Sequence, residues 1–157
     1  MGFALSPLQL RSDSFAPEGS IPKRCAKDGD NLSPHLKWSD APAGTQSFAL
    51  VCHDPDAPLA SVGSYGFVHW VLYNLPASLT ELAEGATAGT QGVSDFGEPG
   101  YGGPLPPPGH GMHHYFFILM ALDRELKLEP GLTLWQLMAK VEPHVIGMNR
   151  LVGTYQR

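Results

Sequence analysis

The chain has few charged residues and few cysteines, and each shortage excludes a class of protein. Charged residues make up 16% of the 157 positions, the formal net charge is −5, and Lys and Arg form no cluster. Non-specific nucleic-acid binding needs a basic surface that releases counterions, so we expect no nucleic-acid partner. Two cysteines, Cys25 and Cys52, do not make a disulfide framework. Each is expected to be a small buried hydrophobic side chain rather than a redox centre.

Long apolar runs are also absent. No run reaches the length of about eighteen residues that a transmembrane helix needs, so we predict no membrane span. Residues 1–7 lack the basic segment followed by an apolar segment that marks a signal peptide. The sequence therefore predicts a cytoplasmic protein.

Glycine and proline, by contrast, are plentiful. There are 18 glycines and 15 prolines, gathered between apolar segments without a periodic repeat. Hydrophobic residues reach 43%, and a chain of this length is long enough to bury a core within one domain. We expect residues 1–157 to form a single, loop-rich, mainly β domain.

Apolar runs predict the strands. Four of them lie at residues 47–52, 67–75, 115–122 and 151–155, and a weaker pattern predicts a strand at 8–12. The run at 115–122 is the most apolar and is expected to be the central strand. Residues 76–84 are expected to add a helical turn.

One helix is well indicated near the C-terminus. Thr133 is a good N-cap, and Gln136 three residues later completes a capping box. The apolar residues that follow have the spacing of one buried helix face: Leu134, Leu137, Met138 and Val141. Pro143 must kink this helix or begin a second one, because proline has no N–H for the helical hydrogen bonds.

Two segments place carboxylates and an imidazole at strand ends. The sequence DPDAP at 54–58 directly follows the run at 47–52, and its prolines stiffen the turn that carries Asp54 and Asp56. Alternation along 67–75 puts His69 on the face shared with Phe67, Val71 and Tyr73. A nearby carboxylate would fix the tautomer of His69 and raise its pKa, making the imidazole a donor to an anion.

A third segment, GMHHY at 111–115, supplies more donors. His113 and Tyr115 are expected on one face of the strand and His114 on the other. Gly111 would let the backbone approach a ligand closely. Because His113 and His114 diverge, we do not expect them to form a metal site with His110. The Pro- and Gly-rich residues 100–109 are expected to form a rigid rim beside this segment.

In this order the segments resemble the phosphatidylethanolamine-binding protein family, specifically its bacterial, Raf-kinase-inhibitor-like branch. The similarity extends from Phe15 to Tyr155. It is carried by DNLSP at 30–34, LKW at 36–38, APAGT at 41–45, SFAL at 47–50, DPDAP at 54–58, HWVLYN at 69–74, DFGEPGYGGP at 95–104, GMHHYFF at 111–117 and LVGTY at 151–155. The resemblance implies a central antiparallel sheet, a second smaller sheet on one side, and C-terminal helices.

The resemblance also implies an anion pocket, and we expect no cofactor. The motif positions of the family's pocket fall on Asp54, His69, Gly111, His113 and Tyr115, and its walls on Asp56, Pro55 and Pro104. Family members accept phosphate-like groups, acetate or the phosphatidylethanolamine head group there. Some relatives inhibit kinases or serine proteases, and homodimers occur among bacterial ones. This chain departs from the family at His114, where Arg is usual, and at Leu105, where the bacterial branch often has Cys.

Three functions remain open at this point. The first is non-catalytic binding of a small anionic or phosphorylated ligand, with regulation of a kinase or protease partner. The second is a hydrolase or isomerase that uses His69 and Asp54 as an acid–base pair. The third is a protein-interaction domain that works independently of the pocket.

Overall fold

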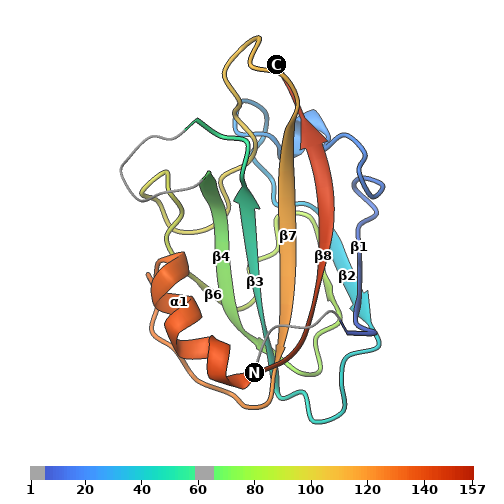
Figure 1. Cartoon of the computed structure of the whole chain (residues 1–157), viewed down its shortest axis with the longest axis vertical. Coiled ribbons are helices and arrows are strands. Elements are labelled where there is room, and N and C mark those ends of the chain that lie inside the picture. Colours follow the sequence, from blue (N-terminus) through green and yellow to red (C-terminus); the bar gives the residue numbers. More distant parts are fainter. Residues whose placement is uncertain (1–5, 59–65) are drawn as a thin grey trace.

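Two antiparallel sheets pack against each other in the computed structural model, which describes residues 6–58 and 66–157 (Figure 1). The larger sheet has the strand order β6-β4-β3-β7-β8, and the smaller one has the order β1-β2-β5. The strands are β1 (Gln9–Arg11), β2 (Leu36–Ser39), β3 (Ser47–Asp54), β4 (Phe67–Pro76), β5 (Glu81–Leu82), β6 (Thr90–Gln91), β7 (His113–Leu122) and β8 (Val145–Tyr155). The helical segments are η1 (Lys23–Cys25), α1 (Leu134–Val141) and η2 (Glu142–His144). Residues 1–5, which begin the segment tested for a signal peptide, lie outside the described residues.

Two apolar clusters lie on opposite faces of the larger sheet. One fills the space between the sheets and includes Trp38 of β2, Trp70 of β4 and Phe117 of β7. The other lies under α1 and includes Val71 of β4 and Leu137 of α1. Because both faces of β3 are covered, its sequence is almost continuously apolar.

The predicted mainly β architecture is confirmed, with corrections to individual strands. β3 and β4 match the predicted runs, and β7 begins two residues earlier than expected. The middle strand of the larger sheet is β3, which has two strands on each side, and not β7, which lies next to the edge strand β8. β8 is much longer than the predicted 151–155, and β2 was not predicted as a strand. Residues 76–84 contain a turn followed by β5 instead of a helical turn.

The C-terminal helix forms as predicted. The Thr133 side chain accepts a hydrogen bond from the Gln136 backbone, and the Gln136 side chain accepts one from the Thr133 backbone, so the capping box is complete. Leu137 and Val141 are buried against the sheet. Pro143 begins no second α-helix but lies in the short 3₁₀ turn η2.

A β-bulge changes the side-chain pattern of β4. Cys52 of β3 pairs with Trp70, whereas the next residue, His53, pairs with Val68, so His69 is the extra residue. As a result His69 and Trp70 both point to the side of the sheet that faces β1 and β2, while Val71 points towards α1. The prediction that His69 shares a face with Phe67 is right. The prediction that Val71 and Tyr73 share that face is wrong, because the bulge breaks the alternation.

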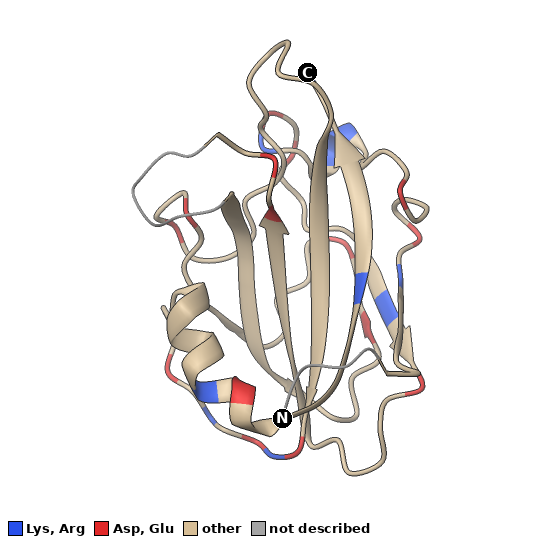
Figure 2. Cartoon of the chain, viewed as in Figure 1, with Lys and Arg blue, Asp and Glu red and all other residues tan. Residues whose placement is uncertain are grey.

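The larger sheet is almost free of charge. Among Lys, Arg, Asp and Glu, its five strands carry only Asp54, at the end of β3, and Arg150, in the middle of β8 (Figure 2). A carboxylate at the end of a buried strand costs desolvation energy unless it is paired. Asp54 therefore needs a hydrogen-bond donor at this end of the sheet.

Both cysteines are buried and unpaired, as the sequence predicted. Burial raises the pKa of the Cys25 thiol to about 11, and burial likewise raises the pKa of Cys52. Both side chains are therefore protonated thiols at neutral pH. In the described ranges, no helix is long and apolar enough to cross a membrane.

Candidate functional site

A cavity of about 240 Å³ opens where β3 ends and β4 and β7 begin, at the upper end of the sheet in Figure 1. Four lining residues carry polar side chains, and the others are apolar or aromatic. The lining consists of Asp54, Ala57, Pro58, Phe67, His69, Phe96, Leu105, Pro106, Pro107, His113 and Tyr115. Larger hollows lie elsewhere: one beside Asn74, one along α1 and one beside Asn31. We place the candidate site in the smaller cavity because buried polar groups converge there.

Asp54 is paired with His113. The Nδ1–H of His113 donates to Oδ2 of Asp54 over 2.7 Å, and both side chains are almost fully buried. Oδ1 of Asp54 accepts a hydrogen bond from the backbone N–H of Asp56, two residues later in the turn. The carboxylate therefore orients the His113 ring and fixes a proton on Nδ1, so that Nε2 is the nitrogen left for other contacts.

His69 is enclosed by aromatic rings. Phe67, Phe96 and Tyr115 contact it with ring centroids 4.9, 5.6 and 5.1 Å away. This burial lowers the pKa of His69, so the ring is neutral at physiological pH. Its Nδ1–H donates to the carbonyl of Gly102 over 2.7 Å, which leaves Nε2 as an acceptor. The predicted upward pKa shift is wrong because desolvation outweighs the nearby carboxylate.

Tyr115 supplies a hydroxyl that has no hydrogen-bond partner in the described part of the chain, although it is buried. Burial raises the pKa of Tyr115, so the phenol keeps its proton. A buried, unpaired hydroxyl costs about 1–3 kcal/mol of desolvation. Together with Nε2 of His69 and the imidazole of His113, it gives the cavity both donors and acceptors on apolar walls.

The remaining predicted site residues do not line the cavity. Gly111 is exposed with φ +98°, and Pro55 is exposed in the turn after β3. Pro104 is buried, and its carbonyl accepts from the backbone N–H of Lys27. Asp56 is paired with His114 on the surface: Oδ2 of Asp56 accepts from both the backbone N–H and Nδ1 of His114. Burial alone would raise the pKa of Asp56, but these hydrogen bonds lower it.

Several lining residues were not predicted. Phe67 and Phe96 form an edge contact with centroids 4.7 Å apart, and Pro106 and Pro107 provide the wall that Pro104 was expected to provide. His110 was noticed only as a candidate metal ligand. Its Nδ1 lies 2.6 Å from Nε2 of His113, so these two histidines do converge. No group of three or more His, Cys, Asp or Glu side chains within residues 6–58 and 66–157 could hold a metal ion.

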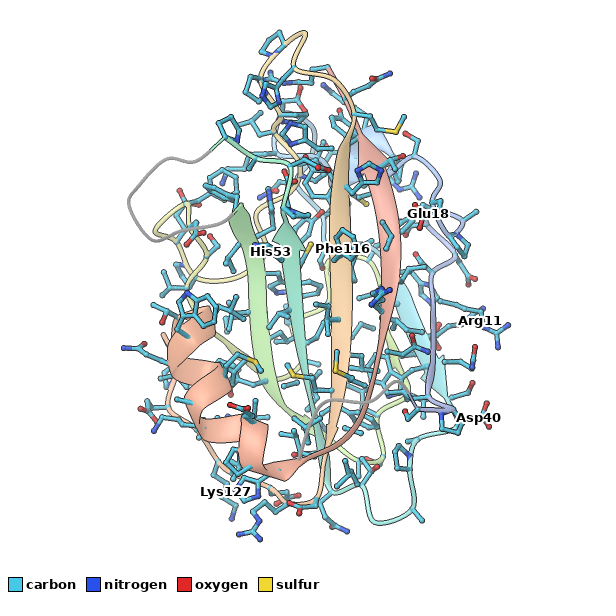
Figure 3. All side chains as sticks on the ribbon, in the orientation of Figure 1. Arg11, Glu18, Asp40, His53, Phe116 and Lys127 are labelled. Atoms are coloured by element: carbon cyan, nitrogen blue, oxygen red, sulfur yellow. The ribbon has the colours of Figure 1, made fainter. Side chains whose placement is uncertain are left out.

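His114 lies on the other side of β7. It pairs with Asp56, whereas Tyr115 points into the cavity, as alternation predicted. The same alternation puts Phe116 opposite His53 on the face away from Tyr115, and Figure 3 labels both on neighbouring strands.

Comparison with known proteins shows the family and agrees with the fold. A family model described as phosphatidylethanolamine-binding protein matches residues 11–156. The chain belongs to the phosphatidylethanolamine-binding protein family. Relatives named UPF0098 protein are 40% identical in Aquifex aeolicus, covering 96% of this chain and 89% of the relative, and 41% identical in Methanothermobacter thermautotrophicus, covering 96% and 99%.

Solved structures of phosphatidylethanolamine-binding protein homologues share the fold. A putative homologue from Chlamydia trachomatis superposes with a TM-score of 0.89 at 38% identity, over 96% of this chain and 97% of that one. YbcL from E. coli, described as a new member of the mammalian family, gives a TM-score of 0.88 at 30% identity, over 97% and 99%.

Residues 100–104, GYGGP, support the cavity wall beside His69 through backbone hydrogen bonds. The Asn31 side chain accepts a hydrogen bond from the backbone N–H of Gly103, and the backbone N–H of Gly102 donates to the carbonyl of His69. A Cβ at Gly102 would lie 2.3 Å from the ring of Phe96. This position is therefore closed to side chains, and Gly102 connects His69 to the aromatic wall.

Replacing Gly102 with Ala is expected to disturb both contacts at once. We expect a loss of about 1–3 kcal/mol in the free energy of unfolding, because overpacking displaces the Phe96 ring. The ring resonances of His69 should also move, since its acceptor carbonyl shifts. Chemical denaturation and NMR of the histidine rings measure the two effects.

Gly131→Ala is the matched control. Unlike Gly102, Gly131 has a positive φ, +84°, and a Cβ there would have no neighbour within 4 Å. The control should lose stability from backbone strain alone and leave the His69 resonances unchanged. Equal resonance changes in both variants would contradict the role given to Gly102.

Proposed function

We propose that the cavity binds a small anionic or phosphorylated ligand without catalysing a reaction. The observation that carries this proposal is the hydroxyl of Tyr115, a residue that lines the cavity: this hydroxyl is buried and has no hydrogen-bond partner in the described ranges. A ligand oxygen would offset its desolvation cost by accepting the missing hydrogen bond. Inorganic phosphate, a phosphomonoester and a phospholipid head group all carry such oxygens.

The other polar groups support a phosphoryl group in particular. Nε2 of His69 accepts, so it suits the P–OH of a singly protonated phosphate, while the Tyr115 hydroxyl donates to a neighbouring oxygen. The apolar side chains of Phe67, Phe96 and Pro107 would contact an organic substituent. Asp54 would orient His113 instead of contacting the anion, because His113 and the Asp56 amide already use its two oxygens.

The hydrolase alternative receives less support. Its acid–base pair was His69 with Asp54, but His69 donates to Gly102 and Asp54 accepts from His113. These two side chains share no hydrogen bond among the described residues. Incubation with p-nitrophenyl phosphate and p-nitrophenyl acetate tests this alternative, and turnover that disappears in His69→Ala would favour catalysis over binding.

Titration with inorganic phosphate and O-phosphoethanolamine, followed by NMR of the histidine rings, tests the binding proposal. We expect the resonances of His69 and His113 to shift at millimolar concentration or below. His144, which pairs with Asp123 at the opposite end of the sheet, serves as the internal control and should not move. If neither probe shifts His69 or His113, the proposal fails.

Regulation of a kinase or protease, homodimer formation and cytoplasmic location stay predictions. A pull-down compares the wild type with His113→Ala. Capture that requires His113 would connect a partner to the cavity, whereas capture that persists would indicate an interaction independent of it.

A further inference from the structure

The nitrogen of His113 that Asp54 does not bind, Nε2, already has a partner within the chain. Nε2 of His113 lies 2.6 Å from Nδ1 of His110, and the two rings meet at 63° with centroids 4.9 Å apart. His113 is 2% exposed and lines the cavity, whereas His110 is exposed and does not line it. The contact therefore joins the buried site to solvent through one side chain.

Only one proton fits between the two rings. Because Asp54 keeps a proton on Nδ1 of His113, Nε2 of His113 either accepts from His110 or donates to it. A ligand oxygen at Nε2 would need the same position and the same hydrogen bond. A second proton on the pair would leave two N–H donors facing each other, and the contact would open.

The exposed His110 ring can leave by rotating about its own side-chain bonds, while a hydrogen bond from the His110 backbone N–H to the Pro107 carbonyl holds the turn. Gly109 and Gly111 flank His110 with φ +73° and +98°, and a Cβ at either would have no neighbour within 4 Å. The preceding rim is fixed separately: the Arg157 carbonyl accepts from the backbone N–H of Gly109, and the Arg157 side chain donates to the carbonyl of Pro106. His110 can therefore rotate away while Pro106 keeps its place in the cavity wall.

We infer that His110 is a latch that competes with the ligand for Nε2 of His113. This inference rests on the proposed anion-binding function. An arriving oxyanion displaces His110, and so does a second proton, so the latch weakens binding most at high pH. The charged and titratable groups around the pair are Asp54, which binds His113; Tyr115; the exposed pair of Asp56 and His114; Tyr155, which lies opposite His113 on β8; and Arg157, whose backbone carbonyl accepts from Gly109.

The test compares phosphate affinity in the wild type, His110→Ala and His114→Ala by calorimetry at about pH 8 and about pH 5.5, which bracket imidazole titration. Freed from one competing hydrogen bond, His110→Ala should bind inorganic phosphate about two- to tenfold more tightly at the higher pH. At the lower pH the affinity of His110→Ala for phosphate should approach that of the wild type. At each pH the wild type and His110→Ala are offered the same ionic form of phosphate. The ratio of their affinities therefore reports the effect of His110 and not the titration of phosphate.

His114→Ala is the control, since it also removes an imidazole beside the site but lies on the opposite side of β7. Its affinity should equal that of the wild type. If His110→Ala binds phosphate equally or more weakly at the higher pH, the latch is overturned while the proposed function stands. If neither the wild type nor His110→Ala binds phosphate or O-phosphoethanolamine, the proposed function fails and the latch fails with it.

Discussion

Tyr115→Phe should weaken phosphate binding about 10- to 150-fold and cost no stability. A hydrogen bond to a charged group contributes about 1.5–3 kcal/mol, and each 1.4 kcal/mol is about tenfold in affinity. In the ligand-free protein the hydroxyl is buried without a partner among the described residues, so its removal leaves the free energy of unfolding unchanged or raises it. Calorimetric titration and urea denaturation measure the two quantities.

Tyr73→Phe makes the matched comparison. The Tyr73 hydroxyl is also buried, but it donates to the carbonyl of Glu129 and accepts from the backbone N–H of Leu132, on the α1 side of the sheet. Its removal should lower the free energy of unfolding by about 1–3 kcal/mol and leave phosphate affinity unchanged. If Tyr115→Phe and Tyr73→Phe change the phosphate affinity and the free energy of unfolding by the same amounts, the Tyr115 hydroxyl has no special role in binding.

Asp54→Ala is expected to destabilise the protein by about 3–5 kcal/mol. The substitution leaves the buried Nδ1–H of His113 and the Asp56 backbone amide without their acceptors, and removing one partner of a buried ion pair typically costs this much. That is a large part of the total stability of a domain, about 5–15 kcal/mol. Thermal and chemical denaturation measure the loss.

Two further variants separate this effect from a general loss of charge. Asp54→Asn keeps an acceptor oxygen for His113, so it should fold and recover part of the loss. Asp56→Ala removes a carboxylate from a pair whose side chains are 41% and 39% exposed, and should cost less than about 1 kcal/mol. Equal costs at Asp54 and Asp56 would contradict the importance of the buried pair.

Local rules explain why some elements could be predicted from the sequence. The capping box at Thr133 satisfies backbone groups three residues away, so neighbouring residues determine where α1 begins. Strict alternation in β7 puts His113 and Tyr115 on one face because no bulge interrupts their pairing with β8. β8 itself was found only in part, since Gly147 and the polar residues after it weaken its apolar pattern.

The composition of the cavity was harder to predict because it depends on contacts between distant segments. His69 contacts Phe96 and also Gly102, which is 33 residues away in the sequence, and only such contacts reveal that the pKa of His69 falls. The sequence pointed to His110 only as a candidate metal ligand, and it was not expected to converge with His113 and His114. Its role depends on a turn, containing two glycines, that brings it back to His113.

The bulge in β4 allows a cavity residue and a core residue to be changed separately, which is useful for engineering the protein. Because the bulge puts His69 and Trp70 on the same side of the sheet, His69 lines the cavity and Trp70 packs in the core, although the two residues are consecutive. Under the proposed function, substitutions at 69 would alter ligand preference while Trp70 stays packed between the sheets. A one-residue deletion at 69 would restore regular pairing in β4 and remove the His69 imidazole from the cavity.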